Sequence, residues 1–202
     1  KTWESLNGLD LIVTEFFDIA TSSIHPNLVA GGTQDNGFLR YDNGETQHLG
    51  TGDGGHTVID WSNANQIFFK DNWSKGLVCK SIDRGKSIAN NIETIQNGLN
   101  FDDFLLTQHP QKANLLYLAK DNVFEIIDHT LPDEQNPLFL YNFTDKDSIE
   151  IDKKRHKIQL FDARAIAVAT SNPNVIYLAA IVKYGKQWES INALFGSKDG
   201  GK

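Results

Sequence analysis

One pattern recurs four times along the chain and limits what it can fold into. Each copy has a short apolar stretch, a polar turn ending in asparagine, and a second stretch rich in β-branched and aromatic residues. Such a pattern predicts a β-hairpin, because proline and asparagine favour turns and the flanking residues favour strands. The copies span 19–32, 58–70, 106–119 and 166–179, anchored by Asn27, Asn65, Asn114 and Asn174. Successive anchors are 38, 49 and 60 residues apart, which is near the period of about 40 to 50 residues in propeller blades.

Each copy continues into further strand-like stretches. After the first copy these are 37–41 and 46–49, and Asn43-Gly44 between them is a strong hairpin signal. Four strands per repeated unit predict an all-β fold, a β-propeller of four-stranded antiparallel blades. We expect one propeller region over 1–202 with about four blades, at roughly 16–50, 56–95, 103–143 and 163–202. The charged stretch 144–157 is expected to be a solvated loop inserted before the last blade.

A shorter motif, Ser-Ile-Asp-Arg-Gly-Lys-Ser-Ile, occupies residues 81–88. Its front half returns at 197–202, and Lys1-Thr2-Trp3 supplies its tail. We expect Asp83 to accept hydrogen bonds from the amides of the turn, and Gly85 to take positive φ where the chain reverses. The two ends of the chain indicate a longer repeat array, whose remaining blades are expected partners.

This motif resembles the Asp box, or BNR repeat, of sialidases, sortilin-type receptors, xyloglucan-cleaving glycoside hydrolases and a photosystem II assembly factor. All of these are β-propellers. The resemblance implies a turn between the outer strands of a blade, on the outer rim. Ile88 stands where the family usually has tryptophan, so an apolar side chain can still tuck under the turn.

Composition and charge exclude several classes of protein. The net charge of −7, with no basic cluster beyond Lys153-Lys154-Arg155, disfavours nucleic acid as a main partner. No apolar run approaches the roughly 18 residues of a membrane helix, so we expect no membrane insertion. Cys79, the single cysteine, is expected to be buried and cannot form an internal disulfide. The compartment stays open, with an extracellular or periplasmic one favoured over the cytoplasm.

Two glycine-rich loops carry the candidate site. Gln34, Asp35 and Asn36 lie in the first, and Asp53 and His56 lie in the second. Glycines let a backbone approach a ligand or a neighbouring strand closely. A hairpin separates the loops, so we expect both on the same side of the sheet, where the two aspartates can bind sugar hydroxyls or share a cation. The alternative is structural: the aspartates only cap turns as the chain crosses between blades.

Other candidate residues are fewer. Trp73 is added to the ligand-binding set because it lies in a polar loop. His25 and His109 occupy equivalent turns in different repeats, which argues against a shared metal site. We expect no cofactor and no dedicated metal site. A divalent cation shared by the two aspartates is the one alternative that stays open.

Two functions remain open, and the sequence leaves catalysis uncertain. The first is a non-catalytic propeller module whose loops bind protein or glycan. The second is a glycoside hydrolase of the xyloglucanase type, in which Asp35 and Asp53 are the catalytic carboxyl pair. A sialidase is disfavoured. Resemblance to that family implies an arginine triad that binds the substrate carboxylate, but this chain has only four arginines, and one of them lies in the 81–88 motif on the rim. Asparagine at position 35 or 53 is expected to weaken ligand binding and leave the fold intact.

Overall fold

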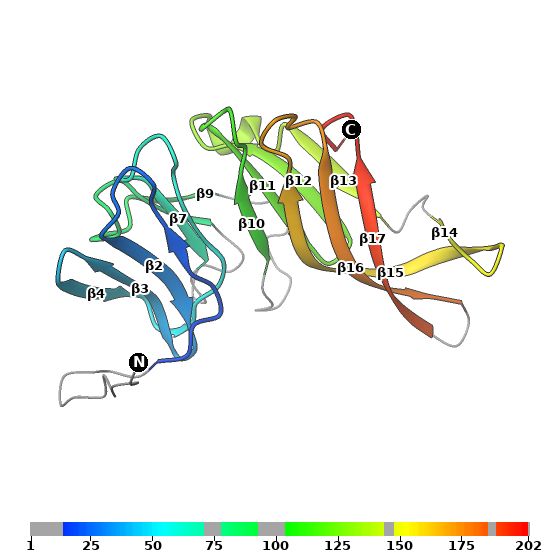
Figure 1. Cartoon of the computed structure of the whole chain (residues 1–202), viewed down its shortest axis with the longest axis horizontal. Coiled ribbons are helices and arrows are strands. Elements are labelled where there is room, and N and C mark those ends of the chain that lie inside the picture. Colours follow the sequence, from blue (N-terminus) through cyan, green and yellow to red (C-terminus); the bar gives the residue numbers. More distant parts are fainter. Residues whose placement is uncertain (1–13, 71–77, 93–103, 144–147, 186–188, 202) are drawn as a thin grey trace, which may run out of the picture.

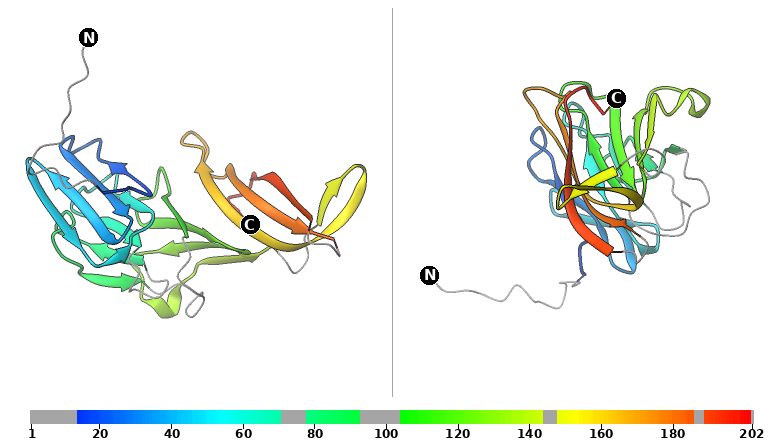
Figure 2. Two further views of the ribbon diagram at one scale, coloured as in Figure 1. Left: turned by 90° about the horizontal axis from the view of Figure 1, so that it is seen from below. Right: turned by 90° about the vertical axis from the view of Figure 1, so that its right-hand side faces the viewer.

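The computed structural model describes residues 14–70, 78–92, 104–143, 148–185 and 189–201. These residues form four antiparallel sheets that follow one another along an arch (Figures 1 and 2). The only helical element among them is η2, a short 3-10 helix (Asp133–Gln135). No helix of the described chain is long and apolar enough to cross a membrane.

The first two sheets match the predicted hairpins. The first contains β1 (Ala20–Thr21), β2 (Leu28–Thr33), β3 (Asn36–Asp42) and β4 (Glu45–Leu49) in that order, with β5 (Gly52–Asp53) parallel to β3. The second contains β6 (Thr57–Ile59), β7 (Ile67–Lys70), β8 (Val78–Ser81) and β9 (Asn90–Ile92). Each strand pairs with the next in the chain, so each sheet is a meander.

The third sheet has the same sequential strand order, and the last sheet differs in which strand lies at its edge. The third contains β10 (Leu105–Gln108), β11 (Leu115–Lys120), β12 (Val123–Asp128) and β13 (Phe139–Asn142). The last contains β14 (Ser148–Ile151), β15 (Lys154–Val168), β16 (Ile176–Tyr184) and β17 (Glu189–Ser197). In the last sheet β17 is an edge strand, whereas the third strands β3, β8 and β12 each pair with a fourth.

The charged stretch before the last sheet is not the loop that the sequence predicted. Residues 148–157 form a hairpin in which β14 pairs with the start of β15. Asp152 and Lys153 both have positive φ (51° and 63°), as a two-residue hairpin turn of type I′ requires. The charged side chains of this hairpin stay exposed, so the expectation of solvation holds and the expectation of an irregular loop was wrong.

Three apolar cores lie between the four sheets. Consecutive residues on a strand face opposite sides of its sheet, and a sheet with a neighbour on each side buries both. Thus Phe69 of β7 joins the core shared with the first sheet, where its ring stacks on Phe38 at 4.0 Å, and Phe68 joins the core shared with the third sheet. Cys79 is 1% exposed in the first of these cores, as predicted.

The first strands of the first three sheets, and the long strand β15 of the last sheet, also contact one another in succession. β1 contacts β6, β6 contacts β10, and β10 contacts β15. Successive four-stranded sheets that pack face to face, with their first strands adjacent, are the blades of a β-propeller. The first and last sheets lie at opposite ends of the arch (Figure 1).

The anchoring asparagine of the repeat has a structural role that the sequence did not reveal. In the second sheet the Asn65 carbonyl accepts a hydrogen bond of 2.9 Å from the Arg84 amide. In the last sheet the Asn174 carbonyl accepts one of 2.8 Å from the Gly200 amide. Arg84 and Gly200 hold equivalent positions in the two copies of the shorter motif, so the two repeats in the sequence are tied to each other in space.

The first and third sheets have the same tie with different partners. The side chain of Asn27 donates to Oδ1 of Asn43 at 2.7 Å. The Asn114 carbonyl accepts a bond of 3.0 Å from the His129 amide, and its side chain donates to Oδ2 of Asp128 at 2.7 Å. In the first three sheets the first turn is therefore bonded to the end of the third strand or to the turn that follows it, and in the last sheet the β15–β16 turn is bonded to the turn after β17.

The turn after β8 has the geometry predicted for residues 81–88. One oxygen of Asp83 accepts bonds from the amides of Lys86 (3.0 Å) and Ser87 (2.9 Å) and from the Ser81 hydroxyl (2.7 Å). The Ser87 hydroxyl donates to the other oxygen at 2.6 Å. Gly85 has φ +77°, as expected. Ile88 is less covered than the motif suggested, since 40% of it is exposed.

A cluster of charges ties this turn to the first sheet. The carboxylate of Asp42 is 5% exposed and contacts His25 Nε2 at 2.8 Å and an Arg84 nitrogen at 3.2 Å. Burial raises the pKa of Asp42, but the hydrogen bond from His25 and the charge of Arg84 outweigh it and hold the pKa below its usual value. His25 thus serves as a rim contact between the first two sheets.

Candidate functional site

The two glycine-rich loops meet at one end of the first sheet. β5 runs parallel to the start of β3, with Asn36 beside Gly52 and Gly37 beside Asp53. Oδ1 of Asp53 accepts a hydrogen bond of 2.9 Å from the amide of Asp35. The loops are therefore on the same side of the sheet, and one carboxylate holds the backbone of the other.

Glycine is needed where the loops cross, because two backbones touch there. A Cβ added to Gly32 lies 2.1 Å from the Gly55 carbonyl oxygen, and one added to Gly54 lies 2.2 Å from the Gly37 carbonyl oxygen. Both contacts are far inside van der Waals distance. The amide of Gly54 also donates to the Thr33 carbonyl at 2.8 Å. These glycines bring the loops together and fix the frame on which the polar side chains sit.

The β2–β3 turn presents its polar side chains outward. Gln34, Asp35 and Asn36 are all exposed, and Asp35 has a positive φ of 62°. The side-chain amide of Asn36 donates to the Gln34 carbonyl and to the Thr14 hydroxyl, both at 3.1 Å. Asn36 therefore braces the turn, whereas Asp35 offers its carboxylate on a turn whose backbone is fixed.

His56 lies on the same connection but bonds to a different acid. Its Nδ1 is 3.4 Å from Oδ2 of Asp18, and the same oxygen accepts the Thr57 amide at 2.9 Å. Burial raises the pKa of Asp18, but the hydrogen bonds from His56 and Thr57 outweigh it and lower the pKa below its usual value. Asp18 was missed in the sequence, where a single acid between Phe17 and Ile19 gives no signal of its role.

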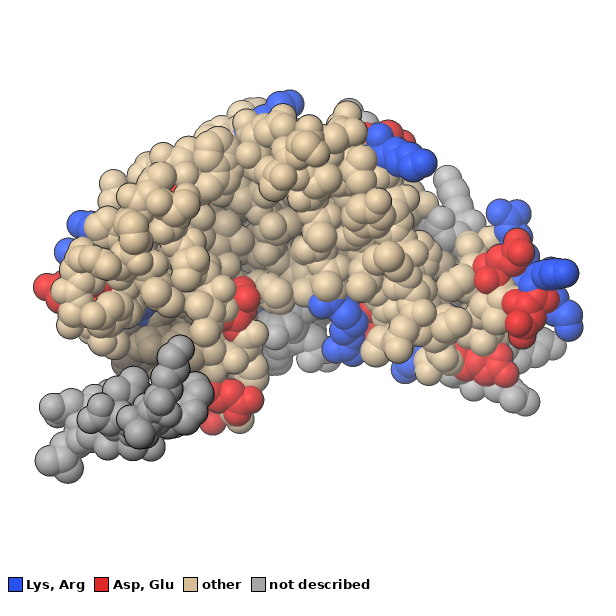
Figure 3. Space-filling model, viewed as in Figure 1, with Lys and Arg blue, Asp and Glu red and all other residues tan. Residues whose placement is uncertain are grey.

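The structure thus brings Asp35 and Asn36 together with Asp53 at one end of the first sheet, beside Gln34, whereas His56 is paired with Asp18. Figure 3 shows acidic side chains at the lower edge of the first sheet, the end at which the β2–β3 turn lies. Trp73, the remaining candidate, lies outside the described residues. Within the described ranges, no group of three or more His, Cys, Asp or Glu is arranged to hold a metal ion.

Comparison with known proteins places the fold and leaves the activity open. No family model matches the chain, and no curated protein matches its sequence. An ancestral GH74 enzyme matches with a TM-score of 0.59 at 15% identity, over 87% of this chain and 25% of its own length. The GH74 xyloglucanase of Xanthomonas campestris matches with the same score and identity, over 91% of this chain and 28% of its own.

A COPII coat structure has a similar likeness. The outer coat vertex of COPII on membranes matches with a TM-score of 0.54 at 11% identity, over 90% of this chain and 49% of that one. The chain spans about a quarter of the length of the GH74 structures. At these identities the matches show the fold alone: the chain is an all-β propeller with four-stranded blades.

Proposed function

We propose that this chain is a non-catalytic propeller module that binds a glycan through the loops around Asp35. The observation that carries this proposal is the bond from the Asp35 amide to the Asp53 carboxylate. Asp53 orders the turn, and the ordered turn holds the side chains of Gln34 and Asp35 in solvent. An amide and a carboxylate fixed in this way suit the hydroxyl groups of a sugar, because the amide can donate and accept hydrogen bonds and the carboxylate can accept them without reorganising.

The turn after β8 supports the wider family resemblance. The hydrogen bonds around Asp83 are those expected of an Asp box, and a second copy at 197–201 repeats part of them. We infer that both turns are Asp boxes on the rim of a sialidase- or xyloglucanase-like propeller. The glycan site then lies at the opposite end of the strands, since β3 runs from the Asp35 turn to the Asn43 turn. An extracellular or periplasmic location suits a module that binds glycan.

A glycoside hydrolase is the second candidate. It is favoured by one observation, that Asp35 in the β2–β3 turn and Asp53 on β5 come together at the same end of the first sheet. In that case both carboxylates act on the glycosidic bond, and the bond from the Asp35 amide to Asp53 positions the second of them. The two candidates differ in what asparagine does at position 53.

The test measures binding and cleavage together. Immobilised xyloglucan oligosaccharides and a glycan array report binding, and reducing-end release from xyloglucan reports cleavage. We expect binding without release, with at least about tenfold weaker binding in Asp35→Asn, on the scale of one lost hydrogen bond to a charged group. Asp53→Ala should weaken binding more than Asp53→Asn, because the asparagine oxygen can still accept the Asp35 amide.

Glu134→Gln is the matched control, since Glu134 is an exposed acid of η2 between the third and fourth strands of another sheet. Release of sugar by the native chain that Asp53→Asn abolishes would establish the hydrolase instead. Binding to no glycan on the array, or equal binding by all variants, would reject the glycan site.

A further inference from the structure

A lysine amine lies between the second and third sheets without an acid beside it. Lys80 lies on β8, opposite Phe68 of β7, and its Nζ is 5.9 Å from the centre of the Phe68 ring. The same nitrogen is 3.2 Å from Nδ1 of His129 and 3.4 Å from the His129 carbonyl oxygen, in the turn after β12. In the part of the chain that the structure describes, Lys80 forms no ion pair. The amine is thus held between a ring face and an imidazole nitrogen.

The hydrogen bonds of His129 determine which of its nitrogens faces this amine. Nε2 of His129 lies 3.0 Å from the Ala113 carbonyl oxygen, which can only accept a hydrogen bond. Nε2 therefore carries the proton of the neutral imidazole, and Nδ1 presents its lone pair to Lys80. The imidazole packs on the Phe68 ring with centroids 4.6 Å apart, and His129 is 8% exposed. A proton acceptor with a fixed direction thus points at the Lys80 nitrogen.

Both groups of this pair are shifted toward their neutral forms. Burial lowers the pKa of Lys80, and the charge of Asp60 offsets this only in part. Burial also lowers the pKa of His129, and the charge of Lys80 lowers it further, against the opposing effects of the backbone carbonyls and Asp60. A neutral amine is a nucleophile and a neutral imidazole is a base, whereas their protonated forms are neither.

The equivalent position in the first sheet holds a cation that is paired with acids. Arg40 and Lys80 each lie on the third strand of their sheet, opposite the residue three positions after the anchoring asparagine. Arg40 is 2% exposed, and its guanidinium nitrogens lie 3.5 Å from Asp42 and 3.9 Å from Glu45. These acids stabilise a permanent charge in the first sheet. The surroundings of Lys80, with no acid in contact among the described residues, favour an uncharged amine instead.

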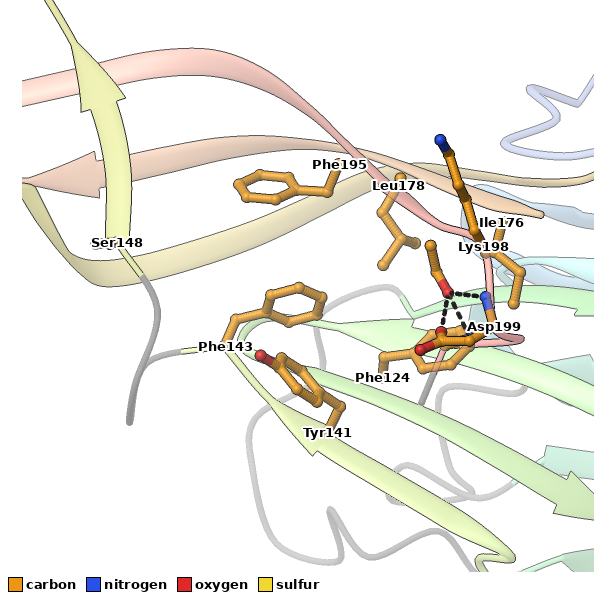
Figure 4. A pocket seen from close by; sticks show the side chains of 12 residues that line it. Phe124, Tyr141, Phe143, Ser148, Ile176, Leu178, Phe195, Lys198 and Asp199 are labelled. Carbon is orange, nitrogen blue, oxygen red and sulfur yellow. Dashed lines mark hydrogen bonds between the residues drawn. The ribbon is translucent and has the colours of Figure 1, made fainter. Parts of the chain in front are cut away.

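A second lysine near aromatic side chains lacks this environment. Lys198 borders a cavity of about 560 Å³ between the third and last sheets, which Phe124 and Phe143 also line. Figure 4 shows the Lys198 side chain directed away from both rings. Lys198 is exposed, so its ammonium group remains hydrated. It offers a comparison with Lys80 within the same chain.

We propose that Lys80 forms an imine with small uncharged aldehydes, and that His129 transfers the protons. The lone pair of Nζ attacks the carbonyl carbon, a C–N bond forms, and the carbonyl electron pair moves to the oxygen. Nδ1 of His129 carries the two amine protons in turn to that oxygen, which leaves as water as the C=N bond forms. Amine and aldehyde lose one water between them, so the reaction needs no oxidant or reductant.

The surroundings of the amine define the class of aldehyde. Lys80 is only partly buried, so a small molecule can reach its amine beside the Phe68 ring. The polar and ring contacts of Lys80 come from His129 and Phe68, and neither supplies a second cation for a phosphate or a carboxylate. An uncharged aldehyde with a short apolar chain therefore fits this position best.

The test is reductive trapping of the imine on the full chain at neutral pH, with propanal as the aldehyde and cyanoborohydride as the reductant. Each imine becomes a stable propylamine, so mass spectrometry of proteolytic peptides gives an initial rate for each lysine. Lys80 should react at least about threefold faster than Lys86 and Lys198, because a larger share of its amine is neutral. Both of these lysines are exposed and serve as internal controls.

His129→Asn separates the proposed chemistry from a merely structural contact. The asparagine oxygen can accept a hydrogen bond from the ammonium but cannot take its proton, so the rate at Lys80 should fall at least about threefold. His109→Asn is the matched control: His109 is also 8% exposed, beside the β10–β11 turn of the same sheet, and its variant should keep the native rate at Lys80.

Circular dichroism should show that both variants are folded at the labelling temperature. The comparison of Lys80 with Lys86 and Lys198 in the native chain needs neither variant. A rate at Lys80 no faster than at these two lysines, or an unchanged rate in a folded His129→Asn, would overturn the proposal.

Discussion

β8 and β17 each precede a copy of the same motif, but they are buried very differently. Val78 and Leu194 each lie three residues before the serine of the turn, and Val78 is 0% exposed whereas Leu194 is 71% exposed. The turns that follow share their serine-centred hydrogen bonds. The turn is thus determined by its own few residues, and the burial of the strand is determined by which sheets lie beside it.

The largest difference between the two strands is expected when Val78 and Leu194 are each shortened to alanine. Val78→Ala should lower the free energy of unfolding by about 2 kcal/mol, because it leaves a space in the core between the second and third sheets. Leu194→Ala should change it by less than about 0.5 kcal/mol, because this side chain is 71% exposed. Urea unfolding measures both values. Equal costs at the two positions would contradict the conclusion that the neighbouring sheets determine how far each strand is buried.

A second change separates backbone strain from packing. Gly85 and Gly44 both have positive φ, but a Cβ on Gly85 lies 2.9 Å from the Phe38 ring, whereas one on Gly44 has no atom within 4 Å. Gly44→Ala should therefore cost about 1 kcal/mol from strain alone. Gly85→Ala should cost more, about 2 kcal/mol, because the turn must also move off Phe38. Urea unfolding measures both costs. A smaller cost for Gly85→Ala than for Gly44→Ala would show that the turn moves away from Phe38 without a loss of stability.

A third change tests the hydrogen bonds within the turn. Asp83→Ala removes an acceptor of four hydrogen bonds and should cost about 1 to 2 kcal/mol. Asp83→Asn keeps one oxygen for the backbone amides and should cost less. Far-ultraviolet circular dichroism should be the same for both variants. A cost indistinguishable from zero for Asp83→Ala would remove the physical basis for the motif.

The sequence predicted the parts of the fold that local chemistry decides. The hairpins, the positive φ of Gly85, the hydrogen bonds to Asp83 and the burial of Cys79 all follow from residues near one another in the chain. The charged hairpin at 148–157 was missed, because its charges resemble those of a loop and its two-residue turn, Asp152-Lys153, lacks the usual glycine.

The candidate site could be predicted only in part, for a related reason. A hairpin between the glycine-rich loops was enough to place Asp35 and Asp53 on one side of the sheet. Which group bonds to which depends on the exact crossing of two backbones at Gly32 and Gly54, which no local pattern encodes. The pairing of Asp18 with His56 across 38 residues was therefore not visible in the sequence.

The turn after β8 should also make the stability of the chain depend on pH. Burial raises the pKa of Asp83, but the hydrogen bonds from Ser87, Ser81 and the Lys86 amide outweigh it and lower the pKa to about 2 from 3.8. Because the folded-state pKa is below that of the unfolded chain, the charged form stabilises the fold. This contribution is complete above about pH 4 and is lost as the pH falls toward 2. The carboxyl carbon signal of Asp83 in an NMR titration measures the pKa directly. In Asp83→Asn the loss in the free energy of unfolding that Asp83 causes between those pH values should disappear. An Asp83 that titrates near 3.8 would show that the turn does not stabilise its charged form.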